Sequence, residues 1–236
     1  MRPFLSAVMP VLDEAARIRA SVGTLLDDIG VDELVVVDGG STDGTVDTLA
    51  GLAAERPRLR LAHGPHGRGP QLHHGAALAR GLVLWFVHCD AQPPTDAGAH
   101  IRRALLPAGV VGGAFRTCTT LDDPVDRPWF RPVLPLADLR SRYTGLPYGD
   151  QALFCRADAY HRCGGFPDQP LLEDVELARR LRLEGRLVCL PASVTVSARR
   201  WRAHPLRTAA VMNTFPLLYR LGVSPERLAR WYGRPR

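Results

Sequence analysis

Residues 34–55 read LVVVDGGSTDGTVDTLAGLAAE, and this stretch decides the fold. It opens with the β-branched run Leu34–Val37, which is typical of a short strand buried on both faces of a sheet. The segment Ser41–Gly44 is a turn and cap cluster, and Thr45–Glu55 follows with the composition of a helix. A buried strand, a polar turn and a helix in this order predict an α/β protein.

The same alternation of apolar runs and helical patterns continues on both sides of this stretch. Strands are expected at residues 4–9, 59–62, 83–87 and 110–115, and helices at residues 15–28 and 70–80. The helix at residues 15–28 places Ile18, Val22, Leu25 and Leu26 on one face. This order predicts a Rossmann-like, mostly parallel sheet with helices on both faces.

The regular pattern breaks in the second half of the chain. Residues 122–147 are rich in Pro, Asp and Arg and are expected to form a loop or short helix over the site. Strands are expected at residues 152–155, 187–190 and 194–196, and helices at residues 173–184 and 205–221. The apolar positions of the helix at 173–184 are Val175, Leu177, Leu181 and Leu183. A C-terminal helical tail is therefore expected after the sheet.

The charge of the chain is concentrated at its C-terminal end. The net charge is +6, and all 30 basic residues are Arg. From Arg199 to Arg236 there are nine Arg and one acid, Glu226, which gives +8 and leaves −2 for the rest. This tail is expected either to contact anionic lipid or phosphate or to form a solvated basic surface. The near-neutral remainder gives no indication of nucleic-acid binding.

Composition and cysteine usage indicate one large domain in a reducing compartment. The 236 residues, 46% hydrophobic and 23% charged, suit a single α/β domain. The five cysteines form no CxxC pair, so a zinc site or a disulfide framework is not expected. Pro10, Asp13 and Glu14 interrupt the N-terminal apolar stretch, and no run approaches the ~20 apolar residues of a transmembrane helix. We therefore expect a cytoplasmic protein.

Acids, glycines and one Arg follow the first four expected strands. The segments are PVLDE at residues 10–14, DGGSTDGT at 38–45, GPHGRG at 64–69 and HCD at 88–90. In an open α/β sheet, ligands bind outside the carboxyl ends of the strands. Asp38 is placed to accept hydrogen bonds from a base or ribose, and Arg68 to meet a diphosphate at a helix start. Asp90 is suited to a hard divalent cation.

Each of these segments also has a structural interpretation. Residues 38–45 could form only a turn with a helix cap, made by Thr42 or Asp43. His88 could be a packed histidine and not a ligand, and His73 and His74 are expected to be structural because they lie on a helix. The loop Gly67–Gly69 alone would be weak support for a phosphate site.

The segments in this order resemble the motifs of the family 2 inverting glycosyltransferases, which have the GT-A fold. Residues 38–45 resemble the DGSTDGT signature, and residues 10–14 resemble PxxNE with Asp13 in place of Asn. Residues 67–90 resemble the Arg-bearing loop, helix and DxD strand, with His88 at the first Asp. Glu173 and Asp174 resemble the ED motif. The resemblance covers roughly residues 5–201.

The resemblance implies a sugar transfer from a nucleotide sugar, expected to be a UDP-sugar, and a role for each motif residue. Asp174 is expected to be the catalytic base, with Glu173 assisting or positioning the acceptor. The residues expected to bind the nucleotide sugar are Pro10, Leu12, Glu14, Asp38, Gly39, Arg68, His88 and Cys89. Asp90 and His88 are expected to hold Mn²⁺ or Mg²⁺, and the imidazole favours Mn²⁺.

A small subgroup of this family, found with radical-SAM partners and labelled arsenosugar-biosynthesis glycosyltransferases, is also similar. It shares HxD, GDQ and SARRW segments, here at residues 88–90, 149–151 and 197–201. By this resemblance Asp150 and Gln151 contact the acceptor, and Arg200 and Trp201 contact the diphosphate or sugar. The acceptor is expected to be a small molecule or a lipid, which with the basic tail suggests work at the inner face of the membrane.

The resemblance divides the chain into two regions and leaves rival functions. Residues 1–198 form the transferase domain, with a nucleotide-binding half at 1–115 and an acceptor half at 116–198, and 199–236 form the tail. A nucleotidyltransferase would carry a Gly-rich, basic loop after the first strand, where Leu12–Glu14 stands here. A non-catalytic sugar-nucleotide-binding protein would not need Asp174. A Rossmann dehydrogenase is disfavoured because no GxGxxG follows the first strand.

Overall fold

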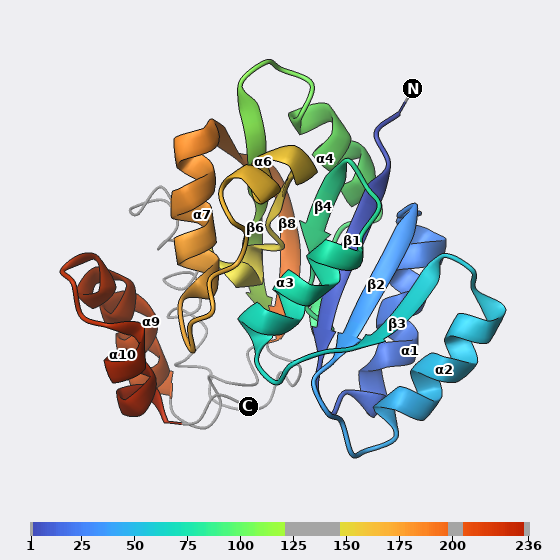
Figure 1. Cartoon of the computed structure of the whole chain (residues 1–236), viewed down its shortest axis with the longest axis horizontal. Coiled ribbons are helices and arrows are strands. Elements are labelled where there is room, and N and C mark those ends of the chain that lie inside the picture. Colours follow the sequence, from blue (N-terminus) through green and yellow to red (C-terminus); the bar gives the residue numbers. More distant parts are fainter. Residues whose placement is uncertain (1, 121–146, 198–204, 234–236) are drawn as a thin grey trace.

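The computed structural model of the chain describes residues 2–120, 147–197 and 205–233 (Figure 1). Its strands are β1 Leu5–Val11, β2 Glu33–Asp38, β3 Leu59–His63, β4 Val83–Phe86, β5 Ala91–Gln92, β6 Val110–Thr120, β7 Phe154–Arg156 and β8 Arg186–Ser197. Its helices are α1 Ala15–Gly23, α2 Thr45–Glu55, α3 Arg68–Leu78, α4 Ala97–Ala104, α6 Ala157–Arg162, α7 Glu173–Glu184, α9 Pro205–Arg220 and α10 Pro225–Tyr232. A π-helix, η1 Thr24–Asp28, follows α1, and a 3₁₀ turn, η3, covers Gly149–Gln151.

The strands form one sheet in the order β3-β2-β1-β4-β7-β6-β8-β5. The first four strands of the chain are parallel neighbours, and β6 pairs in parallel with β8. The short strands β7 and β5 pair with their neighbours in the antiparallel direction. The predicted α/β fold with a mostly parallel sheet is therefore confirmed.

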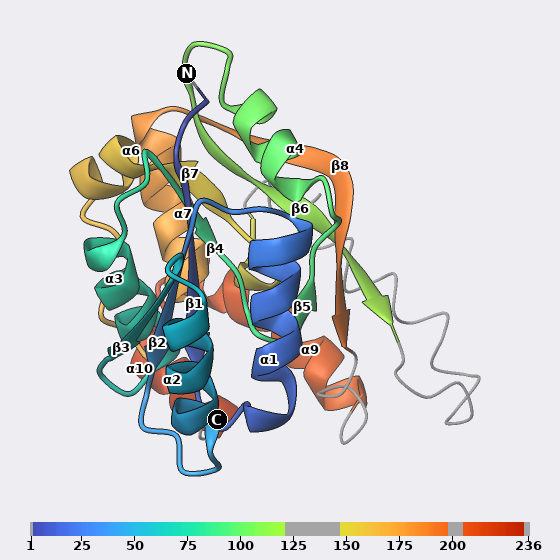
Figure 2. The same cartoon turned by 90° about the vertical axis from the view of Figure 1, so that its right-hand side faces the viewer.

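Apolar side chains fill both faces of the sheet. Figure 2 shows α1 and α4 on one side of the sheet and α3, α6 and α7 on the other. Along β1, Ala7 and Met9 pack on the first side, whereas Val8 packs on the second with Leu72 of α3 and Leu177 of α7. A strand buried on both faces carries no polar alternation, which explains the uninterrupted apolar runs of the sequence.

The register of the parallel strands brings their carboxyl ends level. Val11, the last residue of β1, stands opposite Asp38, the last residue of β2, and Asp38 stands opposite His63 at the end of β3. The loops that follow these strands therefore begin side by side at one edge of the sheet, as the sequence predicted.

The prediction of two separate short strands at residues 187–190 and 194–196 is wrong, because β8 is continuous across both ranges. In the pairing of β6 with β8, Ala114 is opposite Cys189 and Arg116 is opposite Ser193. The strand β8 therefore has more residues between these two pairs than β6 has. This irregularity of the pairing contains Pro191, which has no N–H to donate to the ladder. The sequence pattern thus misread a bulge within one strand as a gap between two.

Other expected boundaries shift for local reasons. The strand expected at residues 152–155 starts at Phe154, because Ala152 has a left-handed backbone with φ 47°. The helix expected at residues 15–28 changes to a π-helix at Thr24, with Leu25 and Leu26 buried. Leu183 is exposed and not an apolar contact of α7, since it lies two residues beyond the buried Leu181. The sequence did not indicate β5, α4, α6 or α10.

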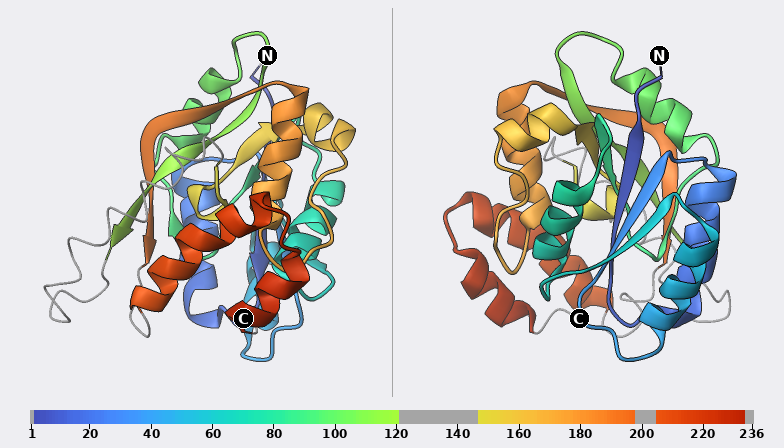
Figure 3. Two further views of the ribbon diagram at one scale, coloured as in Figure 1. Left: turned by 90° about the vertical axis from the view of Figure 1, so that its left-hand side faces the viewer. Right: turned by 45° about the vertical axis from the view of Figure 1, so that its right-hand side comes forward.

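The predicted helical tail is present as the antiparallel pair α9 and α10, here called the C-terminal hairpin. Phe215 of α9 and Tyr232 of α10 face each other with ring centroids 6.3 Å apart, and Leu228 is fully buried. The hydroxyl of Tyr219 donates to Glu176 of α7 at 2.9 Å, which joins the hairpin to the main body. Figure 3 shows the hairpin beside α7. Among the described residues, we find no helix with the length and apolar character required to cross a bilayer.

Candidate active site

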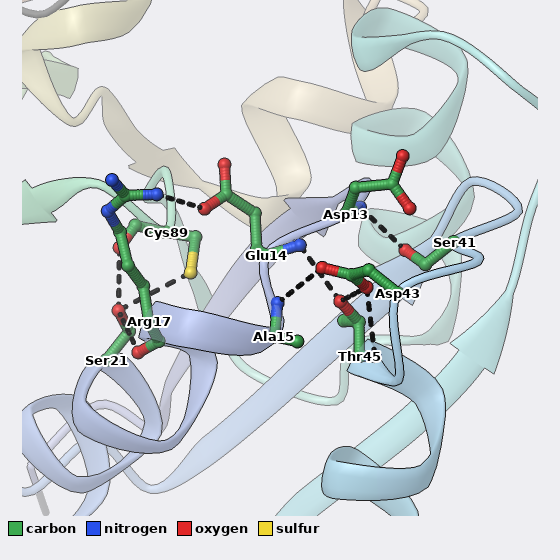
Figure 4. Close-up of polar contacts among 9 residues, drawn as sticks. All are labelled: Asp13, Glu14, Ala15, Arg17, Ser21, Ser41, Asp43, Thr45 and Cys89. Atoms are coloured by element: carbon green, nitrogen blue, oxygen red, sulfur yellow. Dashed lines mark hydrogen bonds and ion pairs between the residues drawn. The ribbon is translucent and has the colours of Figure 1, made fainter.

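The loops after β1 and β2 are joined by hydrogen bonds between their side chains and main chains (Figure 4). The amide of Asp13 donates to the Ser41 hydroxyl at 2.9 Å, and the amide of Thr42 donates to the Asp13 carboxylate at 2.8 Å. Asp13 has a left-handed backbone with φ 54°, an uncommon conformation for a residue other than Gly. The exchange of two bonds holds this conformation, so Asp13 performs a loop-linking role.

The second part of the same junction caps helix α1. The amide of Glu14 donates to the Thr45 hydroxyl at 2.9 Å, and the amide of Ala15 donates to the Asp43 carboxylate at 3.0 Å. The Thr45 hydroxyl in turn bonds Asp43 at 2.5 Å (Figure 4). The hydroxyl of Thr45 and the amide of Ala15 hold the pKa of Asp43 below its usual range. Asp43 thus bonds the first amides of both α1 and α2, at Ala15 and Thr45, although the N-cap residue of α2 is Gly44.

Asp38 lies at the centre of the edge and is buried, with 2% of its surface exposed. Its carboxylate accepts the amides of Gly40 at 2.9 Å and Ser41 at 3.2 Å. His63 at the end of β3 brings its Nδ1 to 3.8 Å from the same carboxylate, and the imidazole is largely exposed. The sequence reasoning missed His63, because only the pairing of β2 with β3 brings it to Asp38.

The acidic pair that opens α7 meets Arg68, which opens α3. Glu173 and Asp174 are both buried, and the guanidinium Nε of Arg68 donates to Glu173. Burial alone would lower the pKa of Arg68, but the carboxylates of Glu173, Asp174 and Asp150 outweigh it and raise that pKa. The structure thus brings together a residue predicted to meet diphosphate and two residues predicted to act in catalysis.

Asp174 is fixed by main-chain donors. The amide of Gly149 donates to one carboxylate oxygen, and the amide of Val175 donates to the other at 2.8 Å. A Cβ on Gly149 would lie 2.9 Å from that first oxygen, so a side chain at this position would displace Asp174. The GDQ segment therefore lies against the acidic pair through Gly149, a contact that the sequence did not predict.

The rest of the GDQ segment has a supporting role in the structure. Gln151 is buried, and its side-chain oxygen accepts the amide of Tyr148 at 2.9 Å. Asp150 lies in the same turn and contributes its charge to the field around Arg68. Arg200 and Trp201, the other residues assigned to diphosphate or sugar, lie outside the described residues.

Left-handed backbone marks three of the predicted motifs. Asp13, Ala152 and Leu172 are the non-glycine residues with positive φ in the described part of the chain, at 54°, 47° and 61°. They lie beside the PVLDE, GDQ and ED segments. Such conformations cost free energy and cluster at functional sites. This is a backbone signal for one site that sequence alone could not supply.

The HCD segment follows β4 at the same edge. Cys89 is buried, its carbonyl accepts the Ser21 hydroxyl at 2.6 Å, and burial raises the pKa of its thiol to about 11. His88 and Asp90 on either side are partly exposed. Over the described ranges, no three His, Cys, Asp or Glu side chains form a group that could hold a metal on its own. One carboxylate and one imidazole still match the donors of Mn²⁺, provided that other oxygens complete the shell.

Pro10, Leu12 and Glu14 also lie at this edge. Pro10 is the next to last residue of β1 and pairs with Val37 of β2. Leu12 is partly exposed and directly follows the strand. The Glu14 carboxylate pairs with Arg17 of the next helical turn at 3.2 Å. The predicted site residues before residue 100 therefore lie at the carboxyl ends of β1 and β2, in the loops that follow the first four strands, or, for Arg68, at the start of α3.

A mostly parallel sheet with polar loops, a buried acidic pair and an Arg at one edge is typical of α/β proteins that bind a ligand at their strand ends. Residues 6–161 match the family described as "Glycosyl transferase family 2". This match covers well over half of the chain, so the chain belongs to glycosyltransferase family 2.

Two kinds of curated relative are similar to this chain. A beta-monoglucosyldiacylglycerol synthase of Nostoc sp. is 24% identical over 197 residues, which are 77% of this chain and 42% of the relative. A glucosyl-3-phosphoglycerate synthase of Mycolicibacterium paratuberculosis is 33% identical over 139 residues, which are 48% of this chain and 42% of the relative. The chain thus spans about two fifths of the length of these relatives.

Solved structures share the fold. The mannosyltransferase PcManGT from Pyrobaculum calidifontis, in complex with GDP-Man and Mn²⁺, superposes with a TM-score of 0.70 at 24% identity, covering 96% of this chain and 67% of that one. TarS of S. aureus, in complex with UDP-GlcNAc, gives a TM-score of 0.62 at 19% identity, covering 82% of this chain and 58% of that one. The chain therefore has the fold of these GT-A-like neighbours.

Proposed function

We propose that this protein transfers a sugar from a nucleotide diphosphate sugar to a hydroxyl acceptor, with inversion at the anomeric carbon. The observation that carries the proposal is the junction of Arg68 with Glu173 and the neighbouring Asp174, at the edge where the Asp38 loop lies. It places a cation for the leaving diphosphate beside carboxylates that can take a proton. Family membership and the sugar nucleotides named with PcManGT and TarS support it.

The donor is proposed to lie across the loops after β1 to β4. Asp38 accepts hydrogen bonds from the base or ribose, and Pro10, Leu12 and Gly39 are proposed to contact the same part of the donor. Arg68 meets the diphosphate, whose negative charge competes with Glu173 for the guanidinium. We favour a UDP-sugar, while the GDP-Man named with PcManGT makes a guanosine donor the alternative to test.

Asp174 is proposed as the base of a single displacement. The acceptor oxygen attacks the anomeric carbon, its proton passes to Asp174, and the bond from the anomeric carbon to the diphosphate oxygen breaks. The amides of Gly149 and Val175 keep the Asp174 carboxylate in place, and the positive charge of Arg68 lies near it without an ion pair between the two among the described residues. Glu173 is engaged by Arg68 and is therefore proposed to position the acceptor and the diphosphate-binding group.

Asp90 and His88 are proposed to hold a divalent cation, Mn²⁺ in preference to Mg²⁺. A cation bound there would supply positive charge to the departing diphosphate. The donor set of one carboxylate and one imidazole supports Mn²⁺. PcManGT is described with Mn²⁺, which supports the same ion.

The acceptor is proposed to enter beside the GDQ segment, with Asp150 and Gln151 near it. Arg200 and Trp201 complete the assignment by resemblance. The arsenosugar-biosynthesis subgroup supports a small-molecule acceptor, and the beta-monoglucosyldiacylglycerol synthase supports a lipid. A nucleotidyltransferase and a non-catalytic binding protein are the rival functions.

Peripheral membrane contact is a second proposal, carried by the exposed surface of the C-terminal hairpin. Leu217, Leu221 and Trp231 are 58%, 73% and 58% exposed. Leu217 lies three residues before the exposed Arg220, and Trp231 lies four residues after the exposed Arg227, spacings that share a helix face. Leu221 and Trp231 directly follow the exposed Arg220 and Arg230. Apolar side chains between arginines suit the headgroup region of an anionic bilayer. Figures 1, 2 and 3 show the hairpin in the lower half of the molecule, toward the edge where β1 and β2 end.

A flotation assay tests the membrane proposal. Vesicles with anionic lipid should carry the native protein at low salt, and a variant with Leu217, Leu221 and Trp231 changed to Ser should float far less. The variant Leu183→Ser removes an equally exposed apolar residue from α7 and serves as the control. No flotation of the native protein at low salt would reject membrane contact.

The main proposal is tested with a panel of nucleotide sugars in the presence of Mn²⁺. Binding is followed by calorimetry and slow donor hydrolysis by release of the nucleoside diphosphate. Binding and hydrolysis of one donor are expected, and both should be weaker in Asp38→Ala. Release of pyrophosphate from a nucleoside triphosphate would indicate the nucleotidyltransferase, and binding without any turnover would indicate the non-catalytic protein.

A further inference from the structure

Gln71 is a buried polar side chain in a helix face that is otherwise small and apolar. It lies in α3, where the other buried residues are Gly69, Leu72, Gly75 and Ala76. Only 4% of its surface is exposed. Burying a primary amide costs free energy unless its hydrogen bonds are made, so we expect the Gln71 amide to have hydrogen-bond partners.

Both hydrogens of its amide nitrogen are used on the ends of two strands. Nε2 donates to the carbonyl of Val11 at 2.9 Å and to the carbonyl of Val37 at 2.8 Å. Val11 is the last residue of β1, and Val37 is the next to last residue of β2. One side chain thus fixes the spacing of the two strands at the point where their loops begin.

The same carboxamide lies against the first residue of the β2 loop. A Cβ at Gly39 would be 2.9 Å from Cδ and Nε2 of Gln71, so only glycine fits here without movement. The amide of Gly39 donates to the Val11 carbonyl at 3.0 Å, and Val11 therefore accepts from both groups. Together these contacts close the end of the β1–β2 ladder beside Asp38.

Helix α3 also carries Arg68, one turn before Gln71. Residues three apart lie on the same side of a helix, and here one reaches the acidic pair of α7 while the other reaches β1 and β2. The helix therefore connects the strand ends proposed to bind the nucleotide with the carboxylates proposed to act in transfer.

We propose that Gln71 is a positioning residue for the nucleotide part of the donor, acting through the main chain of Val11 and Val37. It sets the separation of the Leu12–Glu14 loop from Asp38, and the nucleotide is bound between them. The inference rests on the proposed function for the identity of the ligand. The alternative is that the two bonds only stabilise the fold.

A matched pair of variants separates these roles. Gln71→Met keeps the length of the side chain and removes both donors. Arg58→Met removes a comparable pair of bonds, to the carbonyls of Val31 at 3.0 Å and Leu26 at 2.8 Å, away from the strand ends. Gln71→Asn, which is one methylene shorter, replaces Gln71→Met if the latter does not fold.

Amide hydrogen exchange of the nucleotide-free protein is the first measurement. Exchange over residues 38–42 should be about tenfold faster in Gln71→Met and unchanged in Arg58→Met. Calorimetry with UDP and with GDP is the second, where Gln71→Met should bind about tenfold more weakly or worse, and Arg58→Met within about twofold of native. Thermal melting shows whether the two variants lose similar stability.

The outcomes that overturn the inference are distinct. Native exchange rates in Gln71→Met would show that the strand ends do not depend on the hydrogen bonds of Gln71. An equal loss of affinity in Arg58→Met would show that Gln71 contributes only to stability. Native affinity in Gln71→Met would overturn its role in nucleotide binding. A native protein that binds neither nucleotide would overturn both the proposed function and the role of Gln71 in nucleotide binding. The exchange rates of Gln71→Met and the native protein would still show whether the Gln71 bonds hold the two strand ends.

Discussion

The two ends of the sheet hold their carboxylates in different ways. At the amino ends of β1 and β2, Asp32 pairs with Arg102 at 2.7 Å, and Glu33 pairs with Arg60 at 3.2 Å and accepts the Ser6 hydroxyl at 2.5 Å. These two carboxylates also accept main-chain amides, from Leu5 and Arg80. At the carboxyl ends, Asp38 and Asp174 are held by main-chain amides and form no ion pair with an Arg among the described residues.

The difference separates structural charge from charge that can do chemistry. A carboxylate bonded to Arg is neutralised by its neighbour, and such pairs commonly serve packing and register. A carboxylate held by amides keeps a fixed orientation without a direct bond to an Arg, so a ligand does not have to displace a guanidinium to reach it. Glu173 is the exception at the carboxyl end, because its cation is Arg68, a residue that a diphosphate would also attract.

Asp174→Asn should give the largest effect of any change at the carboxyl end. The amide keeps the size of the side chain but cannot accept the acceptor proton, so turnover should fall by about 10²–10⁴-fold with donor affinity nearly native. Steady-state kinetics and calorimetry measure the two quantities. Asp32→Asn at the amino end should leave turnover of the folded protein unchanged.

Other outcomes at this pair would reassign the roles. If Asp174→Asn turns over normally and Glu173→Gln is inactive, Glu173 is the base. If both variants turn over normally, the base lies elsewhere, and Asp150 becomes the next candidate.

Removal of the metal ligand should give the next largest effect. Asp90→Ala and an excess of chelator should each lower activity by about tenfold or more, and Mn²⁺ should restore the native protein better than Mg²⁺. Asp47→Ala changes an exposed acid of α2 and is the control. Full activity of Asp90→Ala, or of the native protein in chelator, would contradict a metal role.

Asp38→Ala and Arg68→Ala test the nucleotide contacts. Each change removes hydrogen bonds worth about 1–3 kcal/mol, so the dissociation constant for the nucleotide should rise about 5–150-fold. Glu33→Gln, at the other end of β2 from Asp38, should leave that constant unchanged. Native affinity in both variants would place the nucleotide outside these loops.

Glu33→Gln should give the smallest effect, on acid stability alone. Burial would raise the pKa of Glu33, but the Arg80 amide, the Ser6 hydroxyl and Arg60 outweigh it and lower the pKa from its usual value of 4.5. The unfolded state therefore binds this proton more tightly, and the stabilisation is present above about pH 4.5 and is lost as pH falls through the folded value.

The melting temperature measured against pH checks this sign. The native protein should lose about 2–4 °C more than Glu33→Gln when the pH is lowered below 4.5. An equal acid dependence of the two proteins would mean that Glu33 gains nothing from its partners in the folded state.

The fold from β1 to β4 was predictable because its signals are local. A β-branched run at residues 34–37 and the caps that follow it predict a buried strand and a helix without reference to distant residues. The second half depended on pairings that sequence patterns do not encode. Pro191 looks like the end of a strand, and only its position in a bulge opposite β6 makes β8 continuous.

By itself the sequence determined the four segments that follow β1 to β4, since each begins where an apolar run stops. The tertiary structure alone decided that Arg68 meets Glu173, 105 residues away, and that Gln71 reaches Val11 and Val37. The physical reason is that periodicity and capping act within one or two helical turns, whereas a polar side chain buried in the core must take its partners from whatever the packed sheet and helices place beside it.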